Sequence, residues 1–278
     1  MTLPPGARDA RPVGGGYINH AYRARLARGA DAFVKTREGP QPGEYAAEAE
    51  GLRWLAEAGG VRTPAVLEVA DDYLALEWID AGALSAEGAE ELGRGLAVIH
   101  GAGAPCFGDP GFIGLALLGT LSLPNDPAAD WGEFYATRRL LPLAREARDR
   151  ERLSARGAAD VERVCEEISE RVGPAEPPSR LHGDLWLGNV LAGADGRPWL
   201  IDPWAHGGHR EVDLAMLRLF GSPPERTFAA YEEVLPLADG WRDRVALYQL
   251  LPLLVHAALF GGSYVDGAER AARAIAAT

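Results

Sequence analysis

The densest group of chemically capable residues lies in the second half of the chain, where polar side chains interrupt an apolar frame. Asp184 follows His182 and Gly183, Asn189 lies five positions later, and Asp202 ends a short strand-like run. Phosphoryl transfer from ATP needs a carboxylate that orients a hydroxyl and takes its proton. It also needs an amide and a second carboxylate that hold magnesium against the phosphates. We therefore expect Asp184 to be the catalytic base and Asn189 and Asp202 to bind metal.

The single lysine of the chain, Lys35, stands out because the other 27 basic residues are arginines. A codon bias toward arginine explains the 27 and not the exception, since an ammonium and a guanidinium are not interchangeable. Lys35 ends a predicted strand, and Glu48 follows on a predicted helix over residues 44–58. We expect Lys35 to contact the α- and β-phosphates of ATP and Glu48 to hold its ammonium in place.

Each of these pieces alone has an ordinary structural interpretation. His-Gly-Asp is usually a turn in which the Asp caps a neighbouring helix, Asp-Pro is usually a loop, and a lysine at a strand end usually faces solvent. The combination is less ordinary, because a glycine-rich turn, a strand Lys, a helix Glu, His-Gly-Asp, Asn and Asp follow one another in the order typical of kinases. The template has one gap, since Asp202-Pro203-Trp204 stands where protein kinases have Asp-Phe-Gly.

Two further segments are candidates for contacts with the nucleotide. Gly14, Gly15 and Gly16 would let the backbone approach the triphosphate, although they match neither G-x-G-x-x-G nor a Walker loop. Glu77, Trp78 and Ile79, at a change from strand-rich to helix-rich sequence, would offer backbone groups to the adenine edge. An ordinary strand end is an equally good interpretation of Glu77 to Ile79.

Periodicity predicts a strand-rich first part and a helix-rich remainder. The predicted strands cover residues 17–26, 32–35, 66–69 and 73–79. The predicted helices cover residues 44–58, 86–100, 131–170, 226–237 and 239–260. Residues 102–130 and 172–179 are rich in Gly or Pro and are predicted as loops. We therefore expect a nucleotide-binding N-lobe over residues 1–80 and a C-lobe over residues 81–278, with the site in the cleft between them.

Composition narrows the class of protein. The chain has 278 residues, 47% hydrophobic residues and a formal charge of −12, so we expect a globular protein that does not bind nucleic acid. Cys106 and Cys165 are too few for a disulfide framework or a zinc cage. The start lacks the features of a signal peptide, and the apolar stretch 245–260 is short for a bilayer. We expect a cytoplasmic protein without a membrane segment, and oligomeric state stays open.

With these residues in view, the chain resembles the fructosamine kinase (ketosamine 3-kinase) family, within the protein-kinase-like fold shared with aminoglycoside and choline kinases. Trp186 distinguishes this family from aminoglycoside-type enzymes, which typically have His at the corresponding position of the motif H-G-D-x-H-x-x-N. Further matches run along nearly the whole chain: Phe33-Val34-Lys35, Glu48 to Leu52, Phe112-Ile113-Gly114, Asp130-Trp131, Phe134-Tyr135, Arg138-Arg139-Leu140, Asp202-Pro203, Gly208 to Met216, Tyr248-Gln249-Leu250 and Leu259-Phe260-Gly261.

The resemblance implies an α+β, bilobal fold, with a small antiparallel-sheet N-lobe that carries one main helix and a larger, mostly helical C-lobe. It implies phosphorylation of the C3 hydroxyl of a ketosamine, with ATP and Mg²⁺ as cofactors and a role in deglycation. Trp186 and His209 would face the sugar adduct, although a packed aromatic or a structural hydrogen bond is an equal alternative for each. Asp213 would support the catalytic loop. A metal site at His206 and His209 lacks a third ligand.

The sequence departs from the family at two places. Tyr17 stands where some relatives have a redox-sensitive Cys, and Trp204 and His206 replace the residues usual after Asp-Pro. Two other functions stay open: a phosphotransferase acting on aminoglycosides or macrolides, and a silent nucleotide-binding scaffold. The intact set of Lys35, Glu48 and the three residues of the catalytic segment argues against the scaffold. The sequence leaves open which sugar, fructose, ribulose or erythrulose, and which amine carrier are used.

Overall fold

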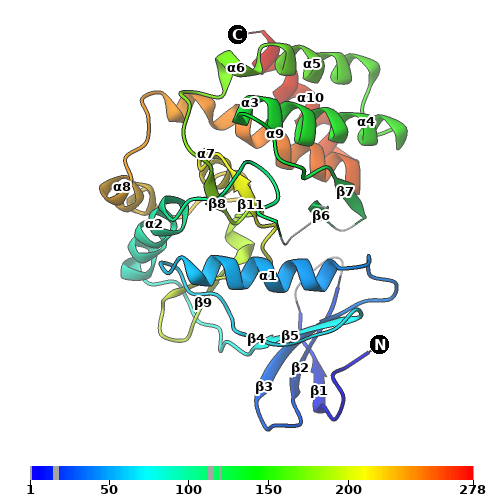
Figure 1. Cartoon of the computed structure of the whole chain (residues 1–278), viewed down its shortest axis with the longest axis vertical. Helices are drawn as coiled ribbons and strands as arrows, with labels where there is room; N and C mark the ends of the chain where they lie inside the picture. Colours follow the sequence, from blue (N-terminus) through cyan, green and yellow to red (C-terminus); the bar gives the residue numbers. More distant parts are fainter. Residues whose placement is uncertain (1, 15–18, 112–115, 119, 278) are drawn as a thin grey trace.

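The computed structural model describes residues 2–14, 19–111, 116–118 and 120–277, so Gly15, Gly16 and Tyr17 lie outside the described residues. A five-stranded antiparallel sheet occupies the first part of the chain, with the order β1-β2-β3-β5-β4 (Figure 1). Its strands are β1 (Arg8–Pro12), β2 (His20–Arg25), β3 (Asp31–Thr36), β4 (Val66–Val69) and β5 (Tyr73–Glu77). Lys35 lies on the central strand β3, between Ala21 and Leu74.

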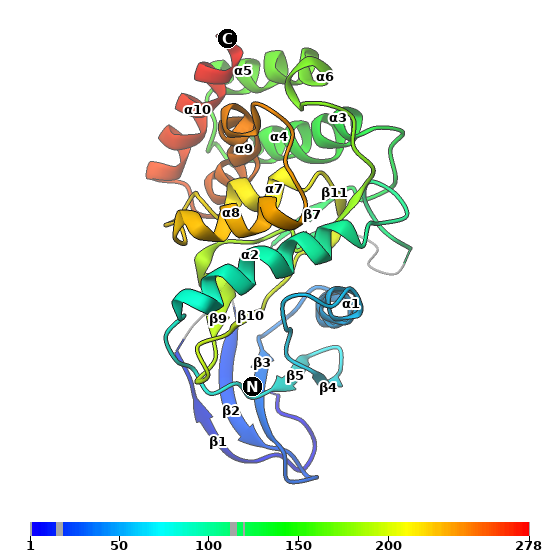
Figure 2. The same cartoon turned by 90° about the vertical axis from the view of Figure 1, so that its left-hand side faces the viewer.

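One helix, α1 (Glu44–Glu57), packs across this sheet and separates it from the helical part of the molecule (Figures 1 and 2). The helix forms where the spacing of apolar residues predicted it. Tyr45, Ala49 and Leu52 are buried against Leu74 and Leu76 of β5. The sheet thereby fixes the face of α1 from which Glu48 projects toward β3.

The two lobes are joined through the segment after β5 and through a hairpin formed by β9 (Val190–Ala192) and β10 (Pro198–Leu200). The amide of Gly82 donates to Ala192 at 2.8 Å, and that of Leu200 donates to the carbonyl of Arg62 at 2.8 Å. The hairpin therefore contacts the chain on both sides of the predicted boundary. That boundary, at residue 80, stays a prediction.

The remainder is mostly helical (Figure 2). It contains two large hydrophobic cores. Helix α2 (Ala86–Gly101) begins at an N-cap, because the Ser85 hydroxyl accepts from the amide of Gly88 at 2.9 Å. The other helical elements are α3 (Trp131–Phe134), the π-helix η1 (Tyr135–Leu140), α4 (Leu141–Asp149), α5 (Ala155–Glu166), α6 (Ile168–Arg171), the 3-10 turn η2 (Leu187–Asn189), α7 (Glu211–Met216), α8 (Glu225–Val234), α9 (Trp241–Phe260) and α10 (Ser263–Ala276). The predicted α+β class is confirmed.

Helix α9 has the length and apolar composition of a membrane span, and it is the one such helix among the described residues. It packs inside the protein, because its buried residues, among them Leu250, Leu254 and Ala257, belong to the larger core. The interpretation of this stretch as a buried helix is confirmed.

Several elements differ from the prediction. Strand β1 was missed because most of its residues are exposed, three of the five are charged and the strand ends in Pro12. The single helical stretch predicted over residues 131–170 breaks after α4, where Glu151 adopts a φ of 56° and Ser154 caps α5. The loop predicted over residues 102–130 includes the hairpin β6 (Ala116–Leu118) and β7 (Leu121–Leu123). Helix α10 was missed because small residues carry much of its buried face.

Candidate active site

Lys35 is the centre of a compact group of charges contributed by both lobes. Its Nζ lies 2.9 and 2.8 Å from the two carboxylate oxygens of Glu48 and 2.8 Å from Oδ1 of Asp202. Burial disfavours the ammonium, but the two carboxylates outweigh burial and hold the pKa of Lys35 above its ordinary value. The structure thus brings together three predicted residues that are up to 167 positions apart in the chain.

Asp184 and Asn189 lie on one loop, which follows β8 (Ser179–Leu181). The Nδ2 of Asn189 donates to the backbone carbonyl of Asp184 at 2.8 Å and to its Oδ2 at 3.0 Å. Gly183 has a φ of 83°, and a Cβ there would lie 2.0 Å from the carbonyl of Trp204. Only glycine fits this turn, which explains the residue between His182 and Asp184.

The loop is held from behind by Asp213, at the start of α7. Its carboxylate accepts from the backbone amides of His182 at 2.7 Å and Gly183 at 2.9 Å. The same carboxylate lies 3.2 Å from Nε2 of His100. The predicted support of the loop by Asp213 is confirmed.

The carboxyl of Asp184 is less acidic than an ordinary Asp. Burial raises its pKa to about 7, and the nearby carboxylates of Asp202 and Asp213 add to this rise. The hydrogen bond from Asn189 acts in the opposite direction. A carboxyl with a pKa near neutrality is well matched to general base catalysis.

The raised pKa predicts a pH-dependent difference in stability between the wild type and Asp184→Asn. The unfolded Asp ionises near pH 3.9, as estimated from model peptides, whereas the folded one ionises at about 7. The folded wild type therefore loses stability relative to the variant as the pH rises from about 4 to about 7, by at most about 4 kcal/mol. Urea denaturation of both proteins at pH 5 and pH 8, without nucleotide, measures the effect. An equal difference at the two pH values would contradict it.

The donor set near Lys35 suits magnesium. Asp202 offers a carboxylate whose side chain is 40% exposed, and both hydrogen bonds of Asn189 use its amide nitrogen rather than its oxygen. Carboxylate and amide oxygens are the ligands that Mg²⁺ accepts, usually with few protein ligands beside substrate phosphates. Asp202 also has a φ of 54°, an unusual backbone conformation that is concentrated at functional sites. The described residues include no group of three or more His, Cys, Asp or Glu that could form a protein-only metal cage.

The predicted nucleotide contacts are only partly described. A Cβ on Gly14 would meet nothing within 4 Å, and Gly15 and Gly16 lie outside the described residues. At the end of β5, the amide of Glu77 already donates to Ala65 at 2.8 Å. The guanidinium of Arg23 lies 4.5 Å from the ring centroid of Trp78. The contact of Glu77, Trp78 and Ile79 with adenine stays a prediction. Because the amide of Glu77 is already bonded, the backbone groups of Trp78 and Ile79 are better candidates for this contact than the amide of Glu77.

The two predicted sugar-facing residues occupy different surroundings. Trp186 is half-buried on the catalytic loop, between Asp184 and Asn189, and meets Phe220 edge-on, with ring centroids 6.2 Å apart. His209 is 3% exposed and stacks on Tyr248, at 5.5 Å, within the aromatic interior. This burial favours the alternative of a packed aromatic ring for His209, and its contact with the sugar adduct stays a prediction.

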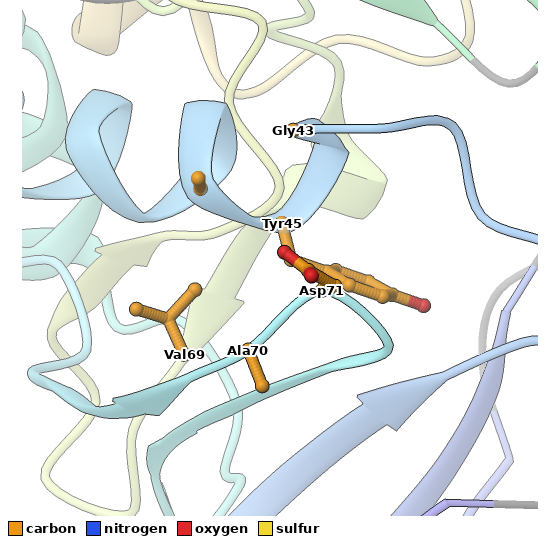
Figure 3. Close-up of a pocket in the computed structure, with 6 residues that line it drawn as sticks. Gly43, Tyr45, Val69, Ala70 and Asp71 are labelled. Carbon is orange, nitrogen blue, oxygen red and sulfur yellow. The ribbon is translucent and has the colours of Figure 1, made fainter.

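Sequence reasoning missed the aromatic residues that continue from Trp186. The ring of Phe220 lies 4.7 Å from that of His256, which lies 5.0 Å from that of Tyr264. The signal in the sequence was His256, which interrupts the apolar stretch over residues 245–260. A separate pocket of ≈ 120 Å³, at the start of α1 and the turn between β4 and β5, is lined by none of the predicted residues (Figure 3).

Comparison with known proteins gives a consistent relationship. The family model for fructosamine kinase matches residues 4–277. A "probable ketoamine kinase" of Thermus thermophilus is 38% identical over 263 residues, which cover 94% of this chain and 92% of that protein. The crystal structure of a "putative fructosamine-3-kinase" from Thermobifida fusca has a TM-score of 0.90 and 44% identity, and covers 98% of this chain and 94% of that chain. A choline kinase of Streptococcus pneumoniae shares the fold at a TM-score of 0.66 and 17% identity, over 99% and 95% of the two chains. The predicted kinase-like fold is confirmed.

Proposed function

Because the chain belongs to the fructosamine kinase family, we propose that it transfers the γ-phosphoryl group of ATP to the C3 hydroxyl of a ketosamine. The single observation that carries the proposal is the ion-pair group in which Lys35 bonds both Glu48 and Asp202. Such a group serves a polyphosphate, since it presents an oriented ammonium beside a carboxylate that can hold a cation.

Each residue has one proposed task. Lys35 binds the α- and β-phosphates, and Glu48 keeps its ammonium in place. Asp184 accepts the hydrogen bond of the C3 hydroxyl and takes its proton. Trp186 faces the sugar adduct from the catalytic loop. Asn189 and Asp202 would hold Mg²⁺, which supplies neutralisation of the phosphate charge when it is bound.

Phosphoryl transfer forms one bond to the γ-phosphorus of ATP and breaks another. The C3 oxygen forms a bond to the γ-phosphorus while the bond from that phosphorus to the bridging oxygen of ADP breaks. The hydroxyl proton goes to Asp184, whose pKa of about 7 lets it accept the proton and return it to water. The products are a ketosamine 3-phosphate and ADP.

The deglycation role rests on the instability of such an ester, which would release the amine from its sugar. The partners would be free or protein-linked ketosamines, and the protein would work in the cytoplasm. Neither an aminoglycoside or macrolide phosphotransferase nor a silent scaffold is favoured. The curated relative in Thermus thermophilus is called a ketoamine kinase, and a scaffold has no need for the complete ion-pair group.

The test is a measurement of kcat/KM for phosphate transfer with fructose-lysine, ribulose-lysine, erythrulose-lysine and a panel of aminoglycosides and macrolides. We expect at least one ketosamine to exceed every antibiotic by at least about a hundredfold, as a site built for particular hydroxyls allows. Repeating the series with free amino acid and peptide carriers ranks the amines. Faster transfer to an antibiotic would overturn the proposal, and so would ATP consumption that no acceptor stimulates.

A further inference from the structure

Helix α1 is shared between the two lobes. One face packs on the sheet through Tyr45, Ala49 and Leu52. Leu55, near the end of the helix, and Val61, just after it, belong instead to a core formed with α2 and α8. The position of Glu48 relative to the catalytic loop therefore depends on how firmly α1 is fastened to the larger lobe.

The first fastening is a close approach at Gly51, one turn after Glu48 on α1. A Cβ on Gly51 would lie 3.1 Å from the Cβ of Ala205 and 3.5 Å from Cγ of Pro203. Pro203 and Ala205 lie one and three positions after Asp202. The helix thus rests on the segment that carries the proposed metal ligand, which brings Glu48 and Asp202 to the same ammonium.

The second fastening is Arg180, on β8, four residues before Asp184. Its guanidinium lies over the ring of Trp54, 4.6 Å from the centroid, and its Nη1 donates to the backbone carbonyl of Trp54. The same nitrogen lies 3.9 Å from a carboxylate oxygen of Glu57. The Arg180 side chain is 14% exposed, so this contact is largely shielded from water.

The C-terminal end of α1 explains why a cation is favourable at this place. The last four carbonyls of a helix have no partner within the helix, and the partial negative charge there favours a cation. The backbone carbonyl of Trp54 is one of these four, and the last turn of α1 contains no basic residue of its own. Arg180 supplies the missing cation from the strand that leads into the catalytic loop.

We propose that Arg180 is a positioning residue that holds the Glu48 helix in register with the catalytic loop, so that Lys35, Glu48 and Asp202 stay assembled without nucleotide. The Nε of Arg180 also donates to the carbonyl of Gly103, after α2, at 3.4 Å, so the guanidinium joins the end of α1 to the larger lobe. Because Arg180 contacts neither the ion-pair group nor the carboxylate of Asp184 directly, it acts through α1. The proposal rests on the proposed kinase function only where nucleotide kinetics are concerned.

The single lysine makes the test specific. An acylating reagent modifies Lys35 and the N-terminal amine, and peptide mass spectrometry separates the two, with the N-terminal amine as an internal reference. We compare Arg180→Met with the wild type at pH 9 without nucleotide. Loosening of the Glu48 contact uncovers the amine of Lys35, which is 8% exposed in the assembled group. We expect Lys35 to react about tenfold faster, which corresponds to a shift of about 1.4 kcal/mol in the opening of the group. The KM for Mg·ATP should rise about fivefold to tenfold, with a smaller change in kcat.

Two further variants separate positioning from general packing. Arg180→Lys keeps one charged donor for the Trp54 carbonyl and should return labelling of Lys35 most of the way to the wild-type rate; peptide mass spectrometry separates the Lys35 peptide from the one that carries the added lysine. Arg152→Met is the matched control, because the Nη1 of Arg152 also donates to a carbonyl in the last turn of a helix, that of Ala258 in α9 at 2.7 Å, and Ala258 belongs to the other core. It should lose stability without any change in the labelling of Lys35.

Wild-type labelling in a folded Arg180→Met would overturn the proposal, and so would equal acceleration in Arg152→Met. If Arg180→Met does not fold, Arg180→Gln, whose amide is too short for the Trp54 carbonyl, carries the same expectation. The labelling result does not depend on the acceptor. A failure of the ketosamine assay together with accelerated labelling would therefore reject the proposed function and keep the role of Arg180.

Discussion

Asp184→Asn is expected to lower kcat for phosphate transfer by about a thousandfold while leaving the affinity for Mg·ATP unchanged. The amide has nearly the shape of the carboxylate and can still meet Asn189, which donates to Oδ2 of Asp184 at 3.0 Å. It cannot accept the proton of the attacking hydroxyl. Steady-state transfer to the best ketosamine gives kcat, and fluorescent nucleotide titration gives the affinity.

The control for this prediction is Asp71→Asn. Asp71 is an exposed carboxylate beside the pocket in Figure 3, far along the chain from the catalytic loop. This variant should transfer phosphate at the wild-type rate. Retention of more than about a tenth of the wild-type kcat in Asp184→Asn would remove Asp184 as the base, because general base catalysis is ordinarily worth at least about a hundredfold.

Lys35→Arg is expected to lower kcat/KM for Mg·ATP by about 10² to 10³, although the charge is conserved. The Lys35 ammonium is a compact donor that meets Glu48 and Asp202 within 2.9 Å while it is 8% exposed. A planar and larger guanidinium cannot occupy that space and still aim one point charge at a phosphate. Kinetics with varied Mg·ATP at saturating ketosamine measure the loss.

The reverse exchange at the surface is the matched control. Arg28 lies on the exposed turn between β2 and β3, so Arg28→Lys should leave kcat/KM unchanged. A Lys35→Arg enzyme with the wild-type rate would contradict the assigned role of Lys35. The presence of a single lysine in the chain would then have no functional explanation.

The Lys35, Glu48 and Asp202 group was predictable because phosphoryl transfer restricts residue types and their order, whatever lies between them. The hairpin β9–β10 and the packing of α1 then set the distances between these three side chains, which could not be predicted from their spacing in the sequence. His209 shows the limit of such reasoning, since a histidine near a motif looks the same in sequence whether it faces a sugar or stacks on Tyr248.

The surroundings of individual arginines are even harder to predict from the sequence than those of His209. Arg180 and Arg28 are both residues of an arginine-rich chain, and only the fold buries one of them against Trp54 and leaves the other in solvent. Strand β1 and helix α10 were missed for a related reason. Pairing of β1 with β2 and packing of small residues in α10 override weak local patterns.

The most direct test of the whole account is acylation of Lys35 in the wild-type enzyme with and without saturating Mg·ATP. If the triphosphate lies against the ammonium between Glu48 and Asp202, Mg·ATP slows acylation of Lys35 at least about tenfold relative to the N-terminal amine, and the ketosamine alone does not. Unchanged acylation of Lys35 in the presence of saturating Mg·ATP would place the nucleotide elsewhere and contradict the account.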